Sequence, residues 1–203
     1  MSMKKSKPVL SAMIAAAVML LAGCSTVNSS YLMKGYPDDP EKMVKRVRVV
    51  ISVPDDKRNM APLLENIAMD MLSLRTNYLI YGSAIAGKGY RESCSDIEGV
   101  ILFTVTEYSV KKDNTAHIKM GCRLYRCTTG DTLWSAEGSA RKSTDDPDLR
   151  AMTGIFREKY PETAPLFAAP LFIMVQDMVD IIPDPELSDE EIDLKIQLES
   201  ERG

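Results

Sequence analysis

The residues with the most distinctive chemistry in this sequence are its four cysteines and its single histidine. A thiolate can attack an electrophile, hold a metal ion, form a disulfide or carry a lipid, and a histidine can transfer a proton near neutral pH. Any Ser/His/Asp triad would have to use His117, which follows a predicted hairpin turn and is expected to face solvent rather than a cleft. The sequence therefore predicts no catalytic residue and no enzyme activity.

Cys24 closes a segment with the layout of a bacterial export signal. Lysines near the start are followed by an uncharged run of 14 residues, 9–22, and by small residues directly before the cysteine. A helix that spans a bilayer needs about 20 apolar residues. We therefore expect residues 1–23 to be a cleaved signal peptide rather than a retained anchor.

Leu21, Ala22, Gly23 and Cys24 resemble the lipobox that the bacterial lipoprotein machinery recognises. The resemblance implies that the chain is cut before Cys24 and that this cysteine receives a diacylglyceryl thioether and a further acyl chain, such as palmitate, on its amino group. Two or three acyl chains hold a protein on a membrane, because each buried methylene contributes about 0.8 kcal/mol. Ser25 follows instead of Asp, which in this family favours the outer membrane, at its periplasmic face. The alternative is an ordinary signal peptide with a cysteine near its cleavage site.

Charge and motif spacing argue against nucleic acid and nucleotides as partners. The chain has a net charge of −4, with eight acidic and two basic residues in the tail 184–203, and it has no basic stripe. A nucleic-acid-binding surface needs such a stripe. The stretch GSAIAGKG, residues 82–89, nearly spells a P-loop, but Gly89 stands where Ser or Thr would hold magnesium, so we interpret it as a surface loop.

We expect no metal ion and no cofactor other than the covalent lipid. The acidic groups at 55–56, 145–146 and 189–191 lack the alternating spacing of a calcium-binding loop, so solvated turns are the better interpretation. The sequence is rich in methionine, which can bind copper. For the methionines on predicted helices, packing in the hydrophobic core is the favoured interpretation. These methionines are Met69, Met71, Met174 and Met178.

The chain is expected to divide into four parts. A lipidated, flexible tether over residues 24–43 follows the signal peptide, because this stretch is polar and contains Gly and Pro. A single periplasmic domain follows over residues 44–183. The acidic tail 184–203 has only a weak apolar pattern and is expected to be a frayed or partner-dependent helix.

The hydrophobic pattern of the domain predicts an α+β fold. The order is strand, helix, strand, then an antiparallel meander of three strands, then a helix. This order gives one mixed sheet of about five strands, with its first two strands parallel and both helices on one face. The expected strands are 44–54, 77–82, 97–110 and 116–126, and the stretch 127–142 is expected to be a turn at Gly130 followed by a strand with Leu133 and Trp134. The expected helices are 60–77 and an apolar helix of up to 18 residues within 164–183, whose start is left open by Pro165 and Pro170 and whose firmest part is 170–181.

The predicted hairpin gives a basis for pairing the remaining cysteines. If residues 113–114 form a two-residue turn, Cys127 lies opposite Val100, and Cys94 precedes Val100 by six residues at the same end of the sheet. A disulfide between Cys94 and Cys127 is therefore favoured in an oxidising compartment.

The same register places Cys122 opposite Val105 on the apolar face, where it is expected to be a buried free thiol. Pairing of Cys94 with Cys122, or the absence of any disulfide, are the alternatives.

The order of elements and the stretch LYRCTTGDTLWSAEGSA, residues 124–140, resemble small bacterial lipoproteins of uncharacterised function. More remotely they are similar to the periplasmic domain of penicillin-binding-protein activator lipoproteins, the curli-secretion lipoprotein and the N-terminal domain of the Tol-system propeller protein. Unlike the curli-secretion lipoprotein, the chain lacks an evident pore-forming insertion, which argues against channel formation. The resemblance implies an α+β domain and is not specific for a function.

The sequence predicts an outer-membrane-anchored lipoprotein whose periplasmic domain binds another envelope protein as a scaffold, activator or assembly factor, without catalysis. The candidate contact regions are the loop 82–94 and the acidic tail, which could bind a basic partner. A subunit of an oligomeric transport or secretion assembly is the alternative, and an enzyme is a third possibility that would need a cleft with perturbed titratable groups.

Overall fold

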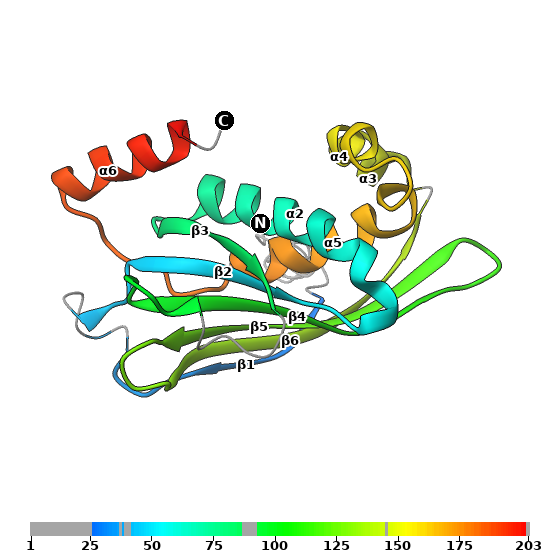
Figure 1. Cartoon of the computed structure of the whole chain (residues 1–203). Helices are drawn as coiled ribbons and strands as arrows, with labels where there is room; N and C mark the ends of the chain where they lie inside the picture. Colours follow the sequence, from blue (N-terminus) through cyan, green and yellow to red (C-terminus); the bar gives the residue numbers. More distant parts are fainter. Residues whose placement is uncertain (1–25, 37, 39–41, 87–92, 145, 202–203) are drawn as a thin grey trace, which may run out of the picture.

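The computed structural model describes residues 26–36, 38, 42–86, 93–144 and 146–201. One open sheet of six strands is covered by helices on one face (Figure 1). The strands are β1 Val27–Leu32, β2 Arg46–Ser52, β3 Leu79–Ile85, β4 Gly99–Val110, β5 Thr115–Arg126 and β6 Thr132–Ser143. The helices are the 3-10 helix η2 Asp55–Met60, α2 Ala61–Arg75, α3 Pro147–Met152, α4 Gly154–Lys159, α5 Ala164–Val179 and α6 Asp189–Ser200.

The predicted α+β class and mixed sheet are confirmed. The strand order is β1-β6-β5-β4-β2-β3, with β2 parallel to both β3 and β4 and every other pair antiparallel. The parallel pair β2 and β3 is joined by α2, and β4, β5 and β6 form the expected meander. The sheet has six strands instead of about five, and the additional strand, β1, comes from the segment expected to be a tether.

The core lies between the sheet and the two long helices. Along β5, alternate residues point to the helical face and are buried, namely Ile118, Met120, Cys122 and Leu124. The helices α2 and α5 contact each other and both cover this face, as predicted. The α5 helix starts at Ala164 and keeps Pro170 buried inside it, so of the possible starts left open by the sequence the helix takes the one at the N-terminal end of the apolar stretch. In the described residues no helix is both long and apolar enough to cross a membrane.

The expectation of a flexible tether over residues 24–43 is wrong for residues 27–32. These residues form β1, which pairs with β6 from Val27 opposite Gly138 to Leu32 opposite Trp134. Residues 28–32 are exposed, so the strand carries no apolar alternation that sequence reasoning could detect. Backbone pairing at the sheet edge holds it instead.

The register of the β4–β5 hairpin also differs from the prediction. Lys111 N donates to Thr115 O at 2.9 Å, so the turn has three residues instead of two, with Asn114 in a left-handed conformation at φ 59°. A bulge between Val105 and Glu107 shifts the pairing again. Cys122 therefore lies opposite Phe103, and Val105 lies opposite Met120.

Cys94 and Cys127 form a disulfide, the pairing that the sequence favoured, with their Cα atoms 5.5 Å apart. The wrong register did not affect this outcome, because Cys127 follows β5 directly and its N–H donates to Glu98 O at 2.8 Å. Cys122 is a free, buried thiol as expected, and burial raises its pKa well above the usual range for a thiol.

Candidate functional site

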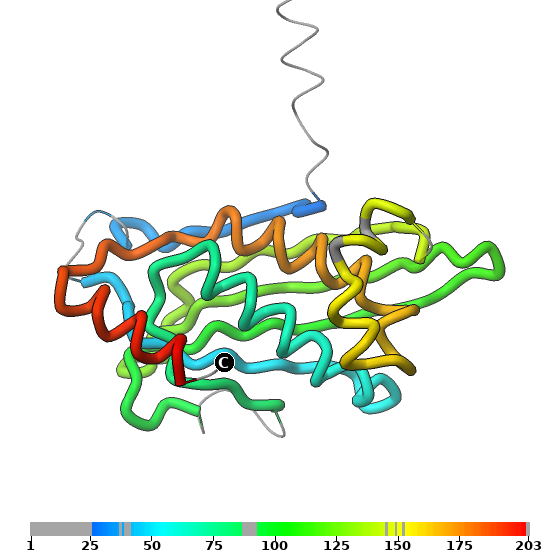
Figure 2. The backbone as a smooth tube through the Cα atoms, turned by 90° about the horizontal axis from the view of Figure 1, so that it is seen from above, coloured from blue at the N-terminus to red at the C-terminus, as the bar shows by residue number. Residues whose placement is uncertain are grey.

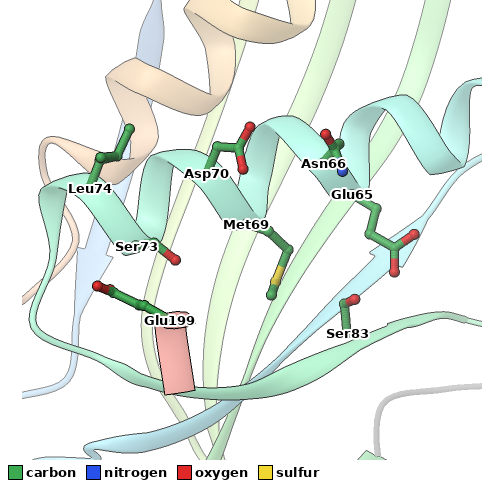
Figure 3. A pocket seen from close by; sticks show the side chains of 8 residues that line it. All are labelled: Glu65, Asn66, Met69, Asp70, Ser73, Leu74, Ser83 and Glu199. Carbon is green, nitrogen blue, oxygen red and sulfur yellow. The ribbon is translucent and has the colours of Figure 1, made fainter. Parts of the chain in front are cut away.

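A groove of about 560 Å³ separates α2 from the edge strand β3, and the end of α6 closes one end of it (Figure 3). Figure 3 shows Glu65, Met69 and Ser73 of α2 projecting toward β3, with Glu199 of α6 beside Ser73, whereas Asn66, Asp70 and Leu74 project away from β3. The groove is lined by Glu65, Asn66, Met69, Asp70, Ser73, Leu74, Ser83 and Glu199.

The wall formed by α2 follows from the amphipathic pattern of this helix. Its buried residues include Leu64, Ile67 and Leu72, which pack on the sheet and on α5. Residues three and four positions apart share a helix face, so Glu65, Met69 and Ser73 form the side that faces the groove. The helix thus presents a polar and acidic surface beside an apolar core surface.

The opposite wall is β3, the last strand of the sheet. Leu79 N donates to Lys45 O and Ala86 N donates to Ile51 O, so the backbone groups of these two residues point to β2. Since alternate residues of a strand direct their backbone groups to opposite sides, those of Ile80 and Ile85 point away from β2. No described strand pairs with this outer edge. An edge of this kind can accept an additional extended strand.

The tail was expected to be frayed or dependent on a partner, but it forms the docked helix α6. A capping box joins Ser188 and Glu191 at its start. Glu191 also forms an ion pair with Lys45, which directly precedes β2, at 2.8 Å. One turn further on, Lys195 Nζ donates to Ser73 O at 3.2 Å and to Thr76 O at 2.5 Å, so a cation binds the last carbonyls of α2.

The contacts of α6 described above are polar, and none of its described residues is fully buried, although Leu194 and Leu198 are half-buried. Ile192 and Ile196 are exposed at 45% and 60%.

The titratable side chains that line the groove are all carboxylates. Glu65 and Asp70 belong to α2 and Glu199 to α6. Glu199 Oε1 is buried and accepts no hydrogen bond from the described residues, although Lys195 Nζ lies 3.5 Å away. Burial first, and then the negative charges of Glu65 and Asp70, raise the pKa of Tyr160. The electrostatics of the groove therefore favour a cationic occupant.

The structure brings together the two contact regions that the sequence indicated. Ser83 belongs to the first region, residues 82–94, and Glu199 belongs to the acidic tail, and both line the groove. Residues 87–92 and the lipidation candidate Cys24 lie outside the described residues. The wall on α2 was missed, although the polar positions between its core residues could have indicated it.

The other candidates from the sequence do not assemble into a site. His117 lines a separate hollow at the far end of the sheet, beside Asp56, Lys57 and Glu107. Among the described residues, no group of three or more His, Cys, Asp or Glu side chains could hold a metal ion.

Comparison with known proteins finds similar solved structures but no family. No family model matches the chain, and no curated protein matches it. A PelC dodecamer from Paraburkholderia phytofirmans has a TM-score of 0.45 and 14% identity, covering 73% of this chain and 94% of that one. Lipoprotein GNA1162 from Neisseria meningitidis has a TM-score of 0.41 and 17% identity, covering 58% and 99%. A minor lipoprotein from Acinetobacter baumannii has a TM-score of 0.23 and 9% identity, covering 76% and 94%. Two of these three are named lipoproteins. At such low identities and TM-scores we transfer no residue role from them.

Proposed function

We propose that the protein is a lipoprotein anchored through Cys24 at the periplasmic face of the outer membrane, and that its domain binds a basic, extended segment of another envelope protein. The segment lies in the groove between α2 and β3. The role is that of a scaffold, activator or assembly factor, without catalysis and without a cofactor, nucleotide or nucleic acid.

The observation that carries this proposal is a groove lined by carboxylates beside β3, the edge strand, whose outer side pairs with no described strand. An extended peptide beside β3 would pair with the backbone of Ile85 and the rest of the outer edge. Its side chains would alternate between solvent and the groove, where Glu65, Asp70 and Glu199 attract Lys or Arg. The backbone pairing provides affinity, and the charges select a basic sequence.

Site-specific photo-crosslinking in cells tests the proposed occupant. A benzophenone amino acid at Ser83 should capture a partner, and mass spectrometry should map the linked segment. A synthetic peptide of that segment is then titrated into the protein. The proposal requires a basic segment whose binding weakens with added salt.

Charge variants provide the specific control for that titration. The double substitution Glu65→Gln with Asp70→Asn should weaken peptide binding roughly tenfold, which corresponds to about 1.4 kcal/mol. Asp131→Asn removes an exposed acid in the turn between β5 and β6 and should leave binding unchanged. An acidic or apolar linked segment, or equal weakening by both variants, would contradict the proposal.

A subunit of an oligomeric transport or secretion assembly remains the alternative function. Size-exclusion chromatography of the lipid-free chain separates the two. A monomer at micromolar concentration supports the binding role, whereas a closed oligomer whose crosslink at Ser83 maps to a second copy of the chain supports the alternative.

A further inference from the structure

The chain is fixed to the domain from Thr26 onward. Thr26 N and Thr26 Oγ1 both donate to Asp177 Oδ2 of α5, at 2.8 and 2.7 Å. On the other side, Ser139 N of β6 donates to Thr26 O at 3.1 Å. Gly138 allows this close approach, because a Cβ at that position would collide with Thr26 O. A helix and a strand thus hold the same residue.

The lipidation candidate is only two positions away. Ser25 alone separates Cys24 from Thr26. An extended chain advances at most about 3.6 Å per residue, so the Cα atom of Cys24 lies within about 7 Å of that of Thr26. A lipid on Cys24 would therefore enter the bilayer beside Thr26 and would allow the domain little freedom to move away.

Thr26 lies on one long edge of the molecule. Figure 2 shows β1 and α5 running side by side along this edge. The exposed side chains here suit a phospholipid surface. Tyr31 and Leu32 of β1 are 53% and 45% exposed, and Arg141 is exposed on β6 beyond the stretch that pairs with β1. Tyrosine is enriched at membrane interfaces, and a guanidinium binds phosphate oxygens.

We propose that the edge formed by β1 and the adjoining end of β6 lies directly against the phospholipid surface, so that the domain sits on the bilayer without a spacer. This inference rests on the proposed lipidation of Cys24. The proposed contact also fixes the orientation of the domain on the membrane. β1 and β3 are the opposite edges of the sheet, and neighbouring strands are about 4.8 Å apart, so the β3 edge stands roughly 24 Å from the membrane-facing edge. The groove then points into the periplasm, toward a partner.

Fluorescence quenching by brominated phospholipids tests this orientation. Trp134 is the single tryptophan, so Tyr31→Trp and Leu74→Trp are each made together with Trp134→Phe. Leu74 is 82% exposed on α2, beside the groove. The lipidated proteins are reconstituted into phosphatidylethanolamine and phosphatidylglycerol vesicles, with and without bromine near the headgroup. Emission from Tyr31→Trp should fall strongly in brominated vesicles, and emission from Leu74→Trp should not change. No quenching at position 31, or equal quenching at both positions, would overturn the proposal.

Two further measurements keep the result unambiguous. A benzophenone amino acid at Tyr31 should form lipid adducts while one at Leu74 should not, and this experiment leaves Trp134 intact. A Gly/Ser linker inserted between Ser25 and Thr26 should retain vesicle binding but abolish both the quenching and the adducts at position 31. Persistence of either signal with the linker would overturn the inference that the short connection to Cys24 seats the domain on the membrane.

Vesicle flotation distinguishes failure of this inference from failure of the proposed function. If the protein with Cys24 does not float with vesicles, the lipoprotein proposal itself is wrong. If it floats, Cys24→Ala does not, and position 31 still gives neither quenching nor adducts, only the seating of the domain on the membrane is wrong.

Discussion

Asp177 on α5 accepts two hydrogen bonds from Thr26, one from its backbone N–H and one from its hydroxyl, across 151 positions of the chain. Because α5 packs on β5 and β6, this contact joins the start of β1 to the centre of the domain. The first described residue is therefore part of the fold and not part of a linker. The packing of the N-terminal segment and its proposed place on the membrane depend on the same two residues.

Asp177→Ala should release β1 without unfolding the rest of the sheet. Hydrogen bonds to charged groups contribute about 1.5–3 kcal/mol each, and both bonds of Thr26 would be lost. Hydrogen exchange at residues 29–32 should become faster, while exchange in β4 and β5 changes little. Asp180→Ala is the matched control, since Asp180 forms only a half-exposed ion pair with Arg75. Unchanged protection of β1 in Asp177→Ala would show that the pairing with β6 suffices by itself.

Gly138→Ala should also destabilise the attachment of β1, but by steric conflict. The added Cβ would collide with the backbone of Thr26, so either β1 moves away or β6 is distorted. Overpacking of this kind costs about 1–3 kcal/mol. Gly121→Ala on β5 is the control, because its Cβ would meet its nearest neighbours at an ordinary 3.5 Å. Thermal unfolding of both variants measures the difference, and equal melting temperatures would contradict this account of Gly138.

Reduction of the disulfide should lower the stability of the whole domain. Cys94 and Cys127 are 33 positions apart, and closing a loop of this length restricts the unfolded chain by about 3–4 kcal/mol in the chain-entropy model. Urea unfolding with and without a reductant measures this difference. The substitution Cys94→Ser should make the protein insensitive to the reductant, whereas Cys122→Ala should leave that sensitivity intact. If Cys94→Ser still responded to reductant, another bond would have to be responsible.

The sequence allowed prediction of those elements whose side chains repeat with a clear period. The alternation of Ile118, Met120, Cys122 and Leu124 marked β5, and the apolar face of α2 marked that helix. β1 could not be predicted in this way, because its residues 28–32 are exposed and the strand is held by backbone pairing, by Asp177 and by the space above Gly138. None of these three contacts leaves a local pattern in the sequence.

The candidate groove also depends on contacts between residues that are distant in the sequence and that leave no local pattern. The sequence indicated the loop 82–94 and the acidic tail separately, but it could not show that Ser83 and Glu199 face the same groove. The docking of α6 depends on Lys195 binding the final carbonyls of α2 from more than a hundred positions away. The hairpin register failed for a related reason, since a bulge after Val105 changes the pairing without a distinctive residue to mark it.

The ion pair between Lys45 and Glu191 should make the docking of α6 dependent on pH. The hydrogen bond from Lys45, followed by that from the Ser188 backbone, holds the pKa of Glu191 below its ordinary value of 4.5. A lowered pKa in the folded state means that this stabilisation is complete above pH 4.5 and is lost as the pH falls through the lowered value. Glu191→Gln tests this effect selectively, because glutamine can still complete the capping box.

At pH 7 the variant should show faster hydrogen exchange in α6 than the unsubstituted protein. The free energy of opening of this helix should fall by about a few tenths of a kcal/mol, the usual contribution of an ion pair that is partly exposed to solvent. Near pH 3 the two proteins should converge. Asp184, whose pKa is raised by burial, is present in both proteins, so its own titration cancels in the comparison. A difference that stayed constant from pH 7 to pH 3 would mean that the carboxylate charge of Glu191 does not hold the helix, and that the backbone carbonyls bound by Lys195 provide the attachment instead.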